Sequence, residues 1–255
     1  MPGADLALLE AAAREAGALA LARVGDPGAV REKPGLGPVS EVDVAVDRLL
    51  AGRLQAARPD YGWLSEEQED DPARLAAERL FIVDPIDGTR AYLAGEPSWA
   101  LSLAVVSAGR PVAAVVHLPA LGRTYAAAAG QGARLNGAAI AASTRPGIEG
   151  ARLLATSGQL APAHWRGRPP AVERRFRPSL AFRLCLIADG WADATVSFRD
   201  TWEWDVAAGD LIAREAGARV TDGAGAVPGY NRPRPLLAGL IAGGSAVHAD
   251  ILGRI

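Results

Sequence analysis

The sequence predicts an α/β protein of layered helices and sheets, and three patterns support this. Apolar residues recur at helical spacing over 5–24 and 41–57. Apolar runs at 80–84, 99–107 and 111–117, the last two joined by a short turn, predict an antiparallel sheet beside these helices. After about residue 147, strands and helices alternate, which is typical of α/β layering. We therefore divide the chain into an N-terminal α+β part, 1–147, and a C-terminal α/β part, 148–255.

The remaining N-terminal elements follow from local signals. The first helix is rich in Ala and Leu, which favour helices. The segment from Gly25 to Pro38 contains several Gly and Pro residues and predicts a loop or a short hairpin. Ser40 is placed to cap the second helix. Two more strands are predicted at 123–129 and 132–135.

The C-terminal part is predicted to alternate between strands and helices. The predicted strands are 152–156, 193–198 and 237–242, and the predicted helices are 179–190, 205–216 and 245–252. Between the first strand and the first helix lies a basic, irregular segment, His164 to Pro178, with arginines within 166–177. It is either a solvated loop or a loop that meets an extra anionic group of a substrate.

Composition limits the possible functions. The 255 residues are 49 % apolar and 22 % charged, which is ordinary for a globular protein. The net charge of -2, without a basic stripe, argues against a nucleic acid polymer as partner. Because there is no signal pattern and no apolar run near 18 residues, we predict a cytoplasmic protein without a membrane partner. The only cysteine, Cys185, excludes an internal disulfide and is predicted in the core.

The most informative segment is Asp84-Pro85-Ile86-Asp87-Gly88-Thr89, which follows the apolar run 80–83. Its proline restricts the backbone and its glycine frees it, so we predict a turn on which the two aspartates converge. Like charges at about 4 Å repel by roughly 4 kcal/mol at an effective dielectric near 20. Such a pair needs a cation, and hard oxygen ligands favour Mg²⁺ or Mn²⁺. Taken alone, the segment is also compatible with a plain turn, because Asp-Pro and Asp-Gly are common turn formers.

Two further acidic segments bear on this choice. Glu66 and Glu67 follow a short apolar stretch, and Asp205 stands at the start of an alanine-rich helix, where a carboxylate suits the helix dipole. Each has a plainer explanation when considered singly. The glutamates begin a longer acidic run that could be a solvated face, and Asp205 could be a helix cap. Combined with Asp84 and Asp87, they favour a metal site.

Together these motifs resemble the inositol monophosphatase family of Mg²⁺-dependent, lithium-sensitive phosphatases. The matching segments, in family order, are the weaker 37–43 segment, Ser65-Glu66-Glu67, the segment 84–89, and Trp204-Asp205-x-Ala-Ala-Gly. The resemblance implies the αβαβα sugar-phosphatase fold, with the site between the two parts. It also implies two or three Mg²⁺ ions and attack by water without a phosphoenzyme.

The resemblance further implies roles for individual residues. The implied metal ligands are Glu66, Asp84, the carbonyl of Ile86, Asp87 and Asp205, with Asp84 bridging two ions. Substrate contacts are expected from Asp87, Gly88, Thr89 and Asp205, with the amides of Gly88 and Thr89 on the phosphate. Arg199 is a further substrate-binding candidate because of its positive charge. The catalytic candidates are Asp43 and Thr89, which would orient and deprotonate the attacking water, and Glu67, which would support the metals or hold a third one.

The strand before Trp204 bears on the substrate. Family members that act on inositol phosphates carry a glutamate there for an inositol hydroxyl, whereas here Ser197 stands near that place and Arg199 follows. The form Glu203-Trp204-Asp205 and the lead-in from Lys33 are more similar to the 3'(2'),5'-bisphosphate nucleotidase branch. We therefore predict hydrolysis of adenosine 3',5'-bisphosphate to AMP and phosphate, with Arg199 or the 166–177 loop on the second phosphate.

Two other hypotheses remain open. One is that inositol-1-phosphate or another sugar phosphate is the substrate. The other is a non-catalytic binding or regulatory protein, against which the complete set of acidic residues speaks. In either enzymatic case the predicted partner is a small phosphorylated molecule. The proteins that this chain resembles include both homodimers and monomers. A homodimer is therefore one of two oligomeric states compatible with the sequence.

Overall fold

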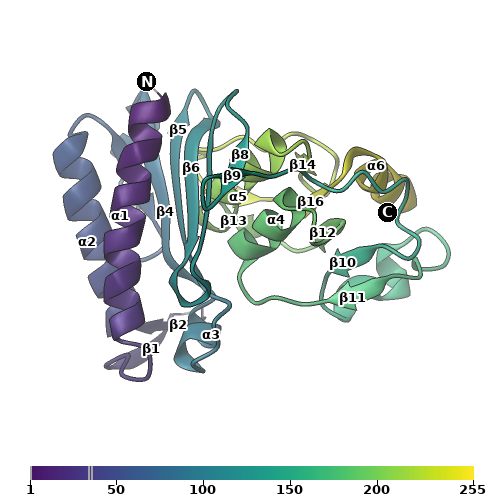
Figure 1. The fold of residues 1–255 in the computed structure, drawn as a ribbon, viewed down its shortest axis with the longest axis horizontal. Helices are drawn as coiled ribbons and strands as arrows, with labels where there is room; N and C mark the ends of the chain where they lie inside the picture. Colours follow the sequence, from purple (N-terminus) through teal and green to yellow (C-terminus); the bar gives the residue numbers. More distant parts are fainter. Residues whose placement is uncertain (1, 34, 36) are drawn as a thin grey trace.

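The computed structural model describes residues 2–33, 35 and 37–255, and its helices and sheets are stacked in layers (Figure 1). From left to right these layers are α1 (Pro2–Ala22) with α2 (Glu41–Ala57), a large sheet, α4 (Leu180–Ala188) with α5 (Glu203–Glu215), a smaller sheet, and α6 (Ser245–Arg254). This order confirms the predicted αβαβα fold. The predicted helices are present, with ends that differ by a few residues.

The large sheet has seven strands in sequence order within the described part of the chain. They are β3 (Gly62–Ser65), β4 (Arg79–Asp87), β5 (Ala100–Ser107), β6 (Arg110–Leu118), β7 (Arg123–Ala128), β8 (Ala133–Leu135) and β9 (Ala138–Ala139). Neighbours are antiparallel, except that β3 runs parallel to β4. The strand β3 was not predicted, because four residues are too few to show a period.

The strand β4 supplies both faces of the large sheet with core residues. Successive side chains of a strand point to opposite faces. Phe81 and Val83 belong to the cluster under α1 and α2, whereas Leu80 and Ile82 belong to the cluster that contains α4 and α5. Because helices cover both faces, residues 80–83 form a continuous apolar run rather than an alternating one.

The same strand continues through Asp87, so the predicted turn after Asp84 is wrong. Asp84 pairs with Ser102 and Asp87 pairs with Ala100, which leaves one extra residue in β4 over this interval. An extra residue of this kind is a β-bulge, and it shifts the alternation of side chains. In a regular strand residues three apart point to opposite faces, so the bulge is what allows both aspartates to serve one site.

The smaller sheet has the order β11 (Glu173–Arg175), β10 (Arg152–Leu154), β12 (Ala194–Ser197), β16 (Leu240–Gly243) and β14 (Arg219–Thr221). Strand β10 is parallel to both neighbours, and β16 is antiparallel to both of its own. Part of the segment predicted as irregular, His164 to Pro178, therefore forms the edge strand β11.

The predicted strand 237–242 is two strands. Its beginning, β15 (Leu236–Leu237), pairs with β13 (Thr201–Trp202), and the remainder is β16. Gly239 lies between them with a φ of +77°, and a Cβ there would stand 2.7 Å from the carbonyl oxygen of Ser197. Only glycine adopts this backbone at such close approach without strain.

Short elements complete the chain. The predicted loop or hairpin from Gly25 to Pro38 contains β1 (Val30–Lys33), which pairs with β2 (Gly37–Ser40); residues 34 and 36 of that prediction lie outside the described residues. The unpredicted helix α3 (Thr89–Leu93) lies near this hairpin (Figure 1). The 3-10 turns are Pro72–Ala76, Pro119–Leu121, Gly158–Leu160 and Pro162–His164. Among the helices described, none has both the length and the apolar character needed to cross a membrane.

Candidate active site

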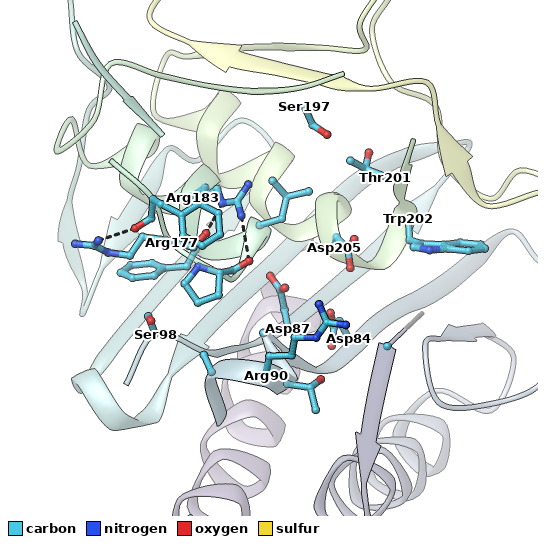
Figure 2. Close-up of a pocket in the computed structure, with 18 of the residues that line it drawn as sticks. Asp84, Asp87, Arg90, Ser98, Arg177, Arg183, Ser197, Thr201, Trp202 and Asp205 are labelled. Atoms are coloured by element: carbon cyan, nitrogen blue, oxygen red, sulfur yellow. Dashed lines mark hydrogen bonds between the residues drawn. The ribbon is translucent and has the colours of Figure 1, made fainter. Parts of the chain in front are cut away.

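Three carboxylates from distant parts of the chain meet in one pocket. Glu66, Asp84 and Asp205 each offer an oxygen, and these oxygens all lie within 4.8 Å of one another. Figure 2 shows Asp84, Asp87 and Asp205 gathered in the centre of the pocket. One residue from each of the three acidic segments of the sequence therefore contributes to the same cluster.

Each member of this carboxylate cluster is placed by a secondary-structure element. Glu66 directly follows β3, and its amide donates to the carbonyl of Val83, which continues the pairing with β4. Asp84 lies in β4, and its Oδ1 accepts a hydrogen bond from the amide of Ile86 at 3.0 Å. Asp205 lies in the first turn of α5, whose N-cap is Trp202. Asp205 is therefore not the N-cap, the plainer role considered from the sequence.

The electrostatics of the cluster favour a bound cation. Asp84 is only 1 % exposed. Burial, and then the charges of Glu66, Asp87 and Asp205, raises its pKa well above the ordinary value. Burial raises the pKa of Glu66 to about 7, and Lys33 opposes this rise. Several carboxylates that resist ionisation together, and that present only hard oxygen atoms, fit a divalent cation such as Mg²⁺.

The protein places one cation of its own beside the cluster. Lys33 Nζ lies 2.8 Å from Glu66 Oε1 and 2.7 Å from Glu67 Oε1. Burial lowers the pKa of Lys33, but the two glutamates outweigh it, so the pKa is raised overall. The structure thus places Glu67 against Lys33, and not in the group of three carboxylates. In the sequence Lys33 stands out only as part of a motif, and nothing there indicates its contact with the two glutamates.

Asp87 connects two layers of the fold. Its Oδ2 accepts hydrogen bonds from the hydroxyl of Ser179 and from the amide of Ala181, both at 2.7 Å. Burial raises the pKa of Asp87, and these hydrogen bonds oppose the rise. Gly88 follows with a φ of +97°, and a Cβ there would stand 3.5 Å from both Ser179 and the carbonyl of Ser98. Asp87 and Gly88 both line the pocket.

Asp43 and Thr89 form the predicted pair of catalytic candidates. Thr89 Oγ1 lies 3.2 Å from Asp43 Oδ1 and 3.1 Å from the carbonyl oxygen of Ile86. Asp43 Oδ2 accepts from the amide of Ser40 at 2.8 Å and from its hydroxyl at 2.5 Å, so the same carboxylate completes the capping box of α2. The predicted cap by Ser40 is confirmed. Burial raises the pKa of Asp43, and the bonds from Ser40 oppose the rise.

The pocket is large and partly cationic. Its volume is about 1630 Å³, and the predicted residues Ile86, Thr89 and Arg199 line it together with the cluster. The positively charged side chains along its walls are Lys33, Arg90, Arg123, Arg177, Arg183 and Arg199. Ser197 also lines the pocket, and its hydroxyl donates to the carbonyl of Arg199 at 3.1 Å.

The basic 166–177 loop contributes less to the pocket than its composition indicates. Of its arginines, Arg177 lines the pocket. Arg174 donates to the carbonyl of Ala155, and Arg175 pairs with Glu173, so these two serve the edge of the smaller sheet. Arg183 was missed, although a single charge inside the apolar helix 180–188 is a visible signal.

Comparisons with known proteins agree with this geometry. Residues 5–254 match the sequence model of the inositol monophosphatase family. An inositol-1-monophosphatase of Rhizobium meliloti is 35% identical over 227 residues, covering 85% of this chain and 82% of that protein. A 3'-phosphoadenosine 5'-phosphate phosphatase of Mycobacterium bovis is 33% identical over 229 residues, covering 84% and 80%. The crystal structure of the extragenic suppressor protein suhB from Bartonella henselae superposes with a TM-score of 0.84 at 27% identity, covering 98% of this chain and 97% of that one.

Proposed function

Because the chain belongs to the inositol monophosphatase family, whose members are metal-dependent phosphatases, we propose that it is a Mg²⁺-dependent 3'(2'),5'-bisphosphate nucleotidase. Its reaction would release phosphate from adenosine 3',5'-bisphosphate and leave AMP. The proposal has three parts, which are the metal, the residues that handle water and phosphate, and the substrate.

The carboxylate cluster is the proposed metal site. Glu66, Asp84 and Asp205 would hold the ions, and we assign Asp87 and the carbonyl of Ile86 to the same set by family resemblance. Glu67, held by Lys33, would support this set or help to hold a third ion. When bound, Mg²⁺ supplies positive charge that stabilises the transition state and lowers the pKa of water. Asp84 is buried and feels the charges of Glu66, Asp87 and Asp205, and by family resemblance it would serve more than one ion.

The protein's own groups would position the reactants. The Asp43 and Thr89 pair is proposed to orient the attacking water and to accept its proton, since a general base must lie within hydrogen-bond reach of the proton that it removes. The raised pKa of Asp43 makes it a stronger base than an ordinary aspartate. Gly88 and Thr89, at the start of α3, would present their amides to the phosphate oxygens.

The observation that carries the choice of substrate is the cationic wall around the carboxylates. A bisphosphate has one phosphate to hydrolyse and another that needs a separate cation. Arg199, on the segment before α5, is exposed and lines the pocket. A charge-assisted hydrogen bond from such a group contributes about 1.5–3 kcal/mol, enough for tenfold or more in specificity. Ser197 has a neutral hydroxyl near the place where an inositol-binding acid is expected.

Inositol-1-phosphate is the second candidate, and one observation favours it: a relative at 35% identity is named for that activity. The two candidate substrates would use Arg199 differently. A second phosphate needs the guanidinium, whereas an uncharged inositol ring needs a hydrogen-bond acceptor. A side-by-side measurement of specificity constants therefore separates them.

The test is phosphate release in the presence of Mg²⁺ from adenosine 3',5'-bisphosphate, adenosine 2'-phosphate, inositol-1-phosphate and fructose-1,6-bisphosphate. We expect the first to have the highest kcat/KM, and Arg199→Ala to lower that value about tenfold or more with a smaller effect on inositol-1-phosphate. Arg168→Ala is the matched control, because Arg168 is exposed on the basic loop and outside the pocket lining that is described. Equal constants for the nucleotide and inositol-1-phosphate would exclude the nucleotidase assignment and leave the metal-dependent phosphatase intact.

A further inference from the structure

One aromatic side chain on the pocket wall is unusually exposed. Phe176 lines the same pocket as the carboxylate cluster, and it is 45 % exposed, although large apolar side chains in this protein are mostly buried. It lies just after the edge strand β11 and just before the cap of α4. Because the ring is exposed, packing in the hydrophobic core does not account for an aromatic residue at this position.

The ring of Phe176 is held from one side by a buried cation. The guanidinium carbon of Arg183 lies 4.7 Å from the centre of the ring, which is the geometry of a cation–π contact. Arg183 is only 8 % exposed, and it belongs to α4. Its Nε donates to the carbonyl of Arg177 at 2.5 Å and its Nη2 donates to the carbonyl of Pro178 at 3.2 Å (Figure 2). These contacts fix both the ring and the chain that carries it.

The neighbouring residue is anchored as well. The Arg177 guanidinium lies 5.1 Å from the centre of the Trp191 ring, and its Nη1 donates to the carbonyl of Phe176 at 2.7 Å. Phe176 and Arg177 therefore have fixed neighbours and do not depend on a substrate for their orientation. A pre-organised ring loses little conformational freedom when a ligand packs on it.

The ring is also close to Asp87. Phe176 is three residues from Ser179, whose hydroxyl contacts Asp87. Three residues span at most about 11 Å between Cα atoms. The ring and Asp87 therefore lie close enough in the shared pocket for one ligand to contact both.

We propose that Phe176, backed by Arg183, is the platform on which the nucleobase of the substrate stacks. This inference rests on the proposed nucleotidase function, and it names how the nucleoside half of that substrate is recognised. Base–aromatic stacking is tolerant of base identity and changes affinity by roughly 5- to 140-fold when the aromatic ring is removed. The platform would thus favour nucleotides over sugar phosphates without selecting adenine strongly.

The test compares the binding of AMP and of ribose 5-phosphate by titration calorimetry, because the two ligands share the sugar phosphate and differ by the base. We expect wild type to bind AMP about tenfold or more tightly than ribose 5-phosphate. Phe176→Ala should remove most of that difference, Phe176→Leu should do the same although it keeps apolar bulk, and Phe176→Tyr should retain it. Val227→Ala, at an exposed valine outside the described pocket lining, is the control and should bind as wild type does.

Two results would overturn the platform. One is equal binding of AMP and ribose 5-phosphate by wild type. The other is a loss in Phe176→Leu that affects both ligands alike, which would mean a packing role. Thermal melting checks that each variant folds. If Phe176→Ala does not fold, the binding comparison is made with Phe176→Leu instead. The nucleotidase function is tested by a different measurement. If it is wrong, the protein does not release phosphate from adenosine 3',5'-bisphosphate, whatever the binding constants for AMP and ribose 5-phosphate are.

Discussion

The carboxylate of Asp87 and the hydroxyl of Ser179 are joined by a 2.7 Å hydrogen bond across 92 positions of the chain. The Ser179 hydroxyl also accepts from the amide of Phe182 at 3.0 Å, so it caps α4 while it donates to Asp87. The end of β4 and the start of α4 are therefore one hydrogen-bonded unit. A metal-site candidate in the large sheet is positioned by the helix layer that separates the two sheets.

This unit predicts different outcomes for its two members. Ser179→Ala removes a helix cap, so we expect a loss of about 0.5–2 kcal/mol in the free energy of unfolding and a modest loss of activity. Asp87→Asn removes a charge proposed to hold a metal, so we expect activity to fall by orders of magnitude. Denaturant unfolding and phosphate release measure the two effects. Ser157→Ala, at an exposed serine that makes no side-chain cap, is the control. Normal activity in Asp87→Asn would contradict the assignment of Asp87.

Activity is predicted to depend on a divalent metal through the carboxylate cluster. Asp205→Asn removes one of three carboxylates whose oxygens lie within 4.8 Å of one another, and we expect phosphate release to fall by orders of magnitude. Lithium should inhibit, by family resemblance. The measurement is phosphate release with Mg²⁺, with Mg²⁺ and Li⁺, and with excess chelator. Turnover at the wild-type rate in chelator would exclude the metal mechanism.

Lys33 predicts how strongly the fold depends on the metal. It is the only lysine in the chain, and its ammonium group contacts both Glu66 and Glu67. Mg²⁺ at about 100 times its dissociation constant should add roughly 2.7 kcal/mol of stability to wild type. Lys33→Met removes the internal counter-charge, so metal-free protein should melt at a lower temperature and gain more from Mg²⁺ than wild type does. Arg31→Ala, on the exposed β1 of the same hairpin, is the control. An unchanged melting temperature of wild type in Mg²⁺ would argue against a preformed cluster.

The sequence identified the acidic members of the site because chemistry restricts which residues can occupy such motifs. Glu66, Asp84 and Asp205 were named, and they meet. The local backbone was less accessible: Pro85 and Gly88 indicated a turn, but the strand continues through a bulge because its partner β5 continues to pair. The pairing of two strands depends on residues that are far apart in the sequence. The residues around Pro85 and Gly88 alone therefore do not predict it.

The cationic members were less predictable for the same reason. Arg183 reaches the loop at 176–178 through bonds to backbone carbonyls, which carry no sequence signature. Conversely, the 166–177 loop looked like an anion site from its composition, yet of its five arginines Arg177 lines the pocket, whereas Arg174 and Arg175 serve the edge of the smaller sheet. Charge can be counted from a sequence, whereas the direction in which a long side chain points depends on the packing around it.

The last prediction concerns pH, and its sign follows from Glu66. Burial raises the pKa of this carboxyl from 4.5 to about 7, so between these values the folded protein binds more protons than the unfolded chain. Stability of the metal-free protein should then fall as pH rises from about 5 to about 7. The raised pKa values of Asp84 and Asp205, again caused first by burial, act in the same direction. The lowered pKa values of Asp70, Glu149 and Asp250 act at lower pH, outside this window. Burial lowers the pKa values of His117 and His248 below 6.5, so these two histidines act inside the window with the opposite sign, and comparison with a Glu66 variant isolates the contribution of the carboxyl.

Mg²⁺ should reverse this dependence, because the metal binds the deprotonated carboxylates. Its apparent affinity should rise with pH up to about pH 7, by at most about tenfold per pH unit for each displaced proton. The measurement is the melting temperature at several pH values between about 5 and 8, in chelator and in saturating Mg²⁺. In chelator the temperature should decrease with pH in wild type and less steeply in Glu66→Gln, which cannot ionise. If the metal-free melting temperature depends on pH in the same way in wild type and in Glu66→Gln, then Glu66 is not held against ionisation and the cluster is not preformed to receive a cation.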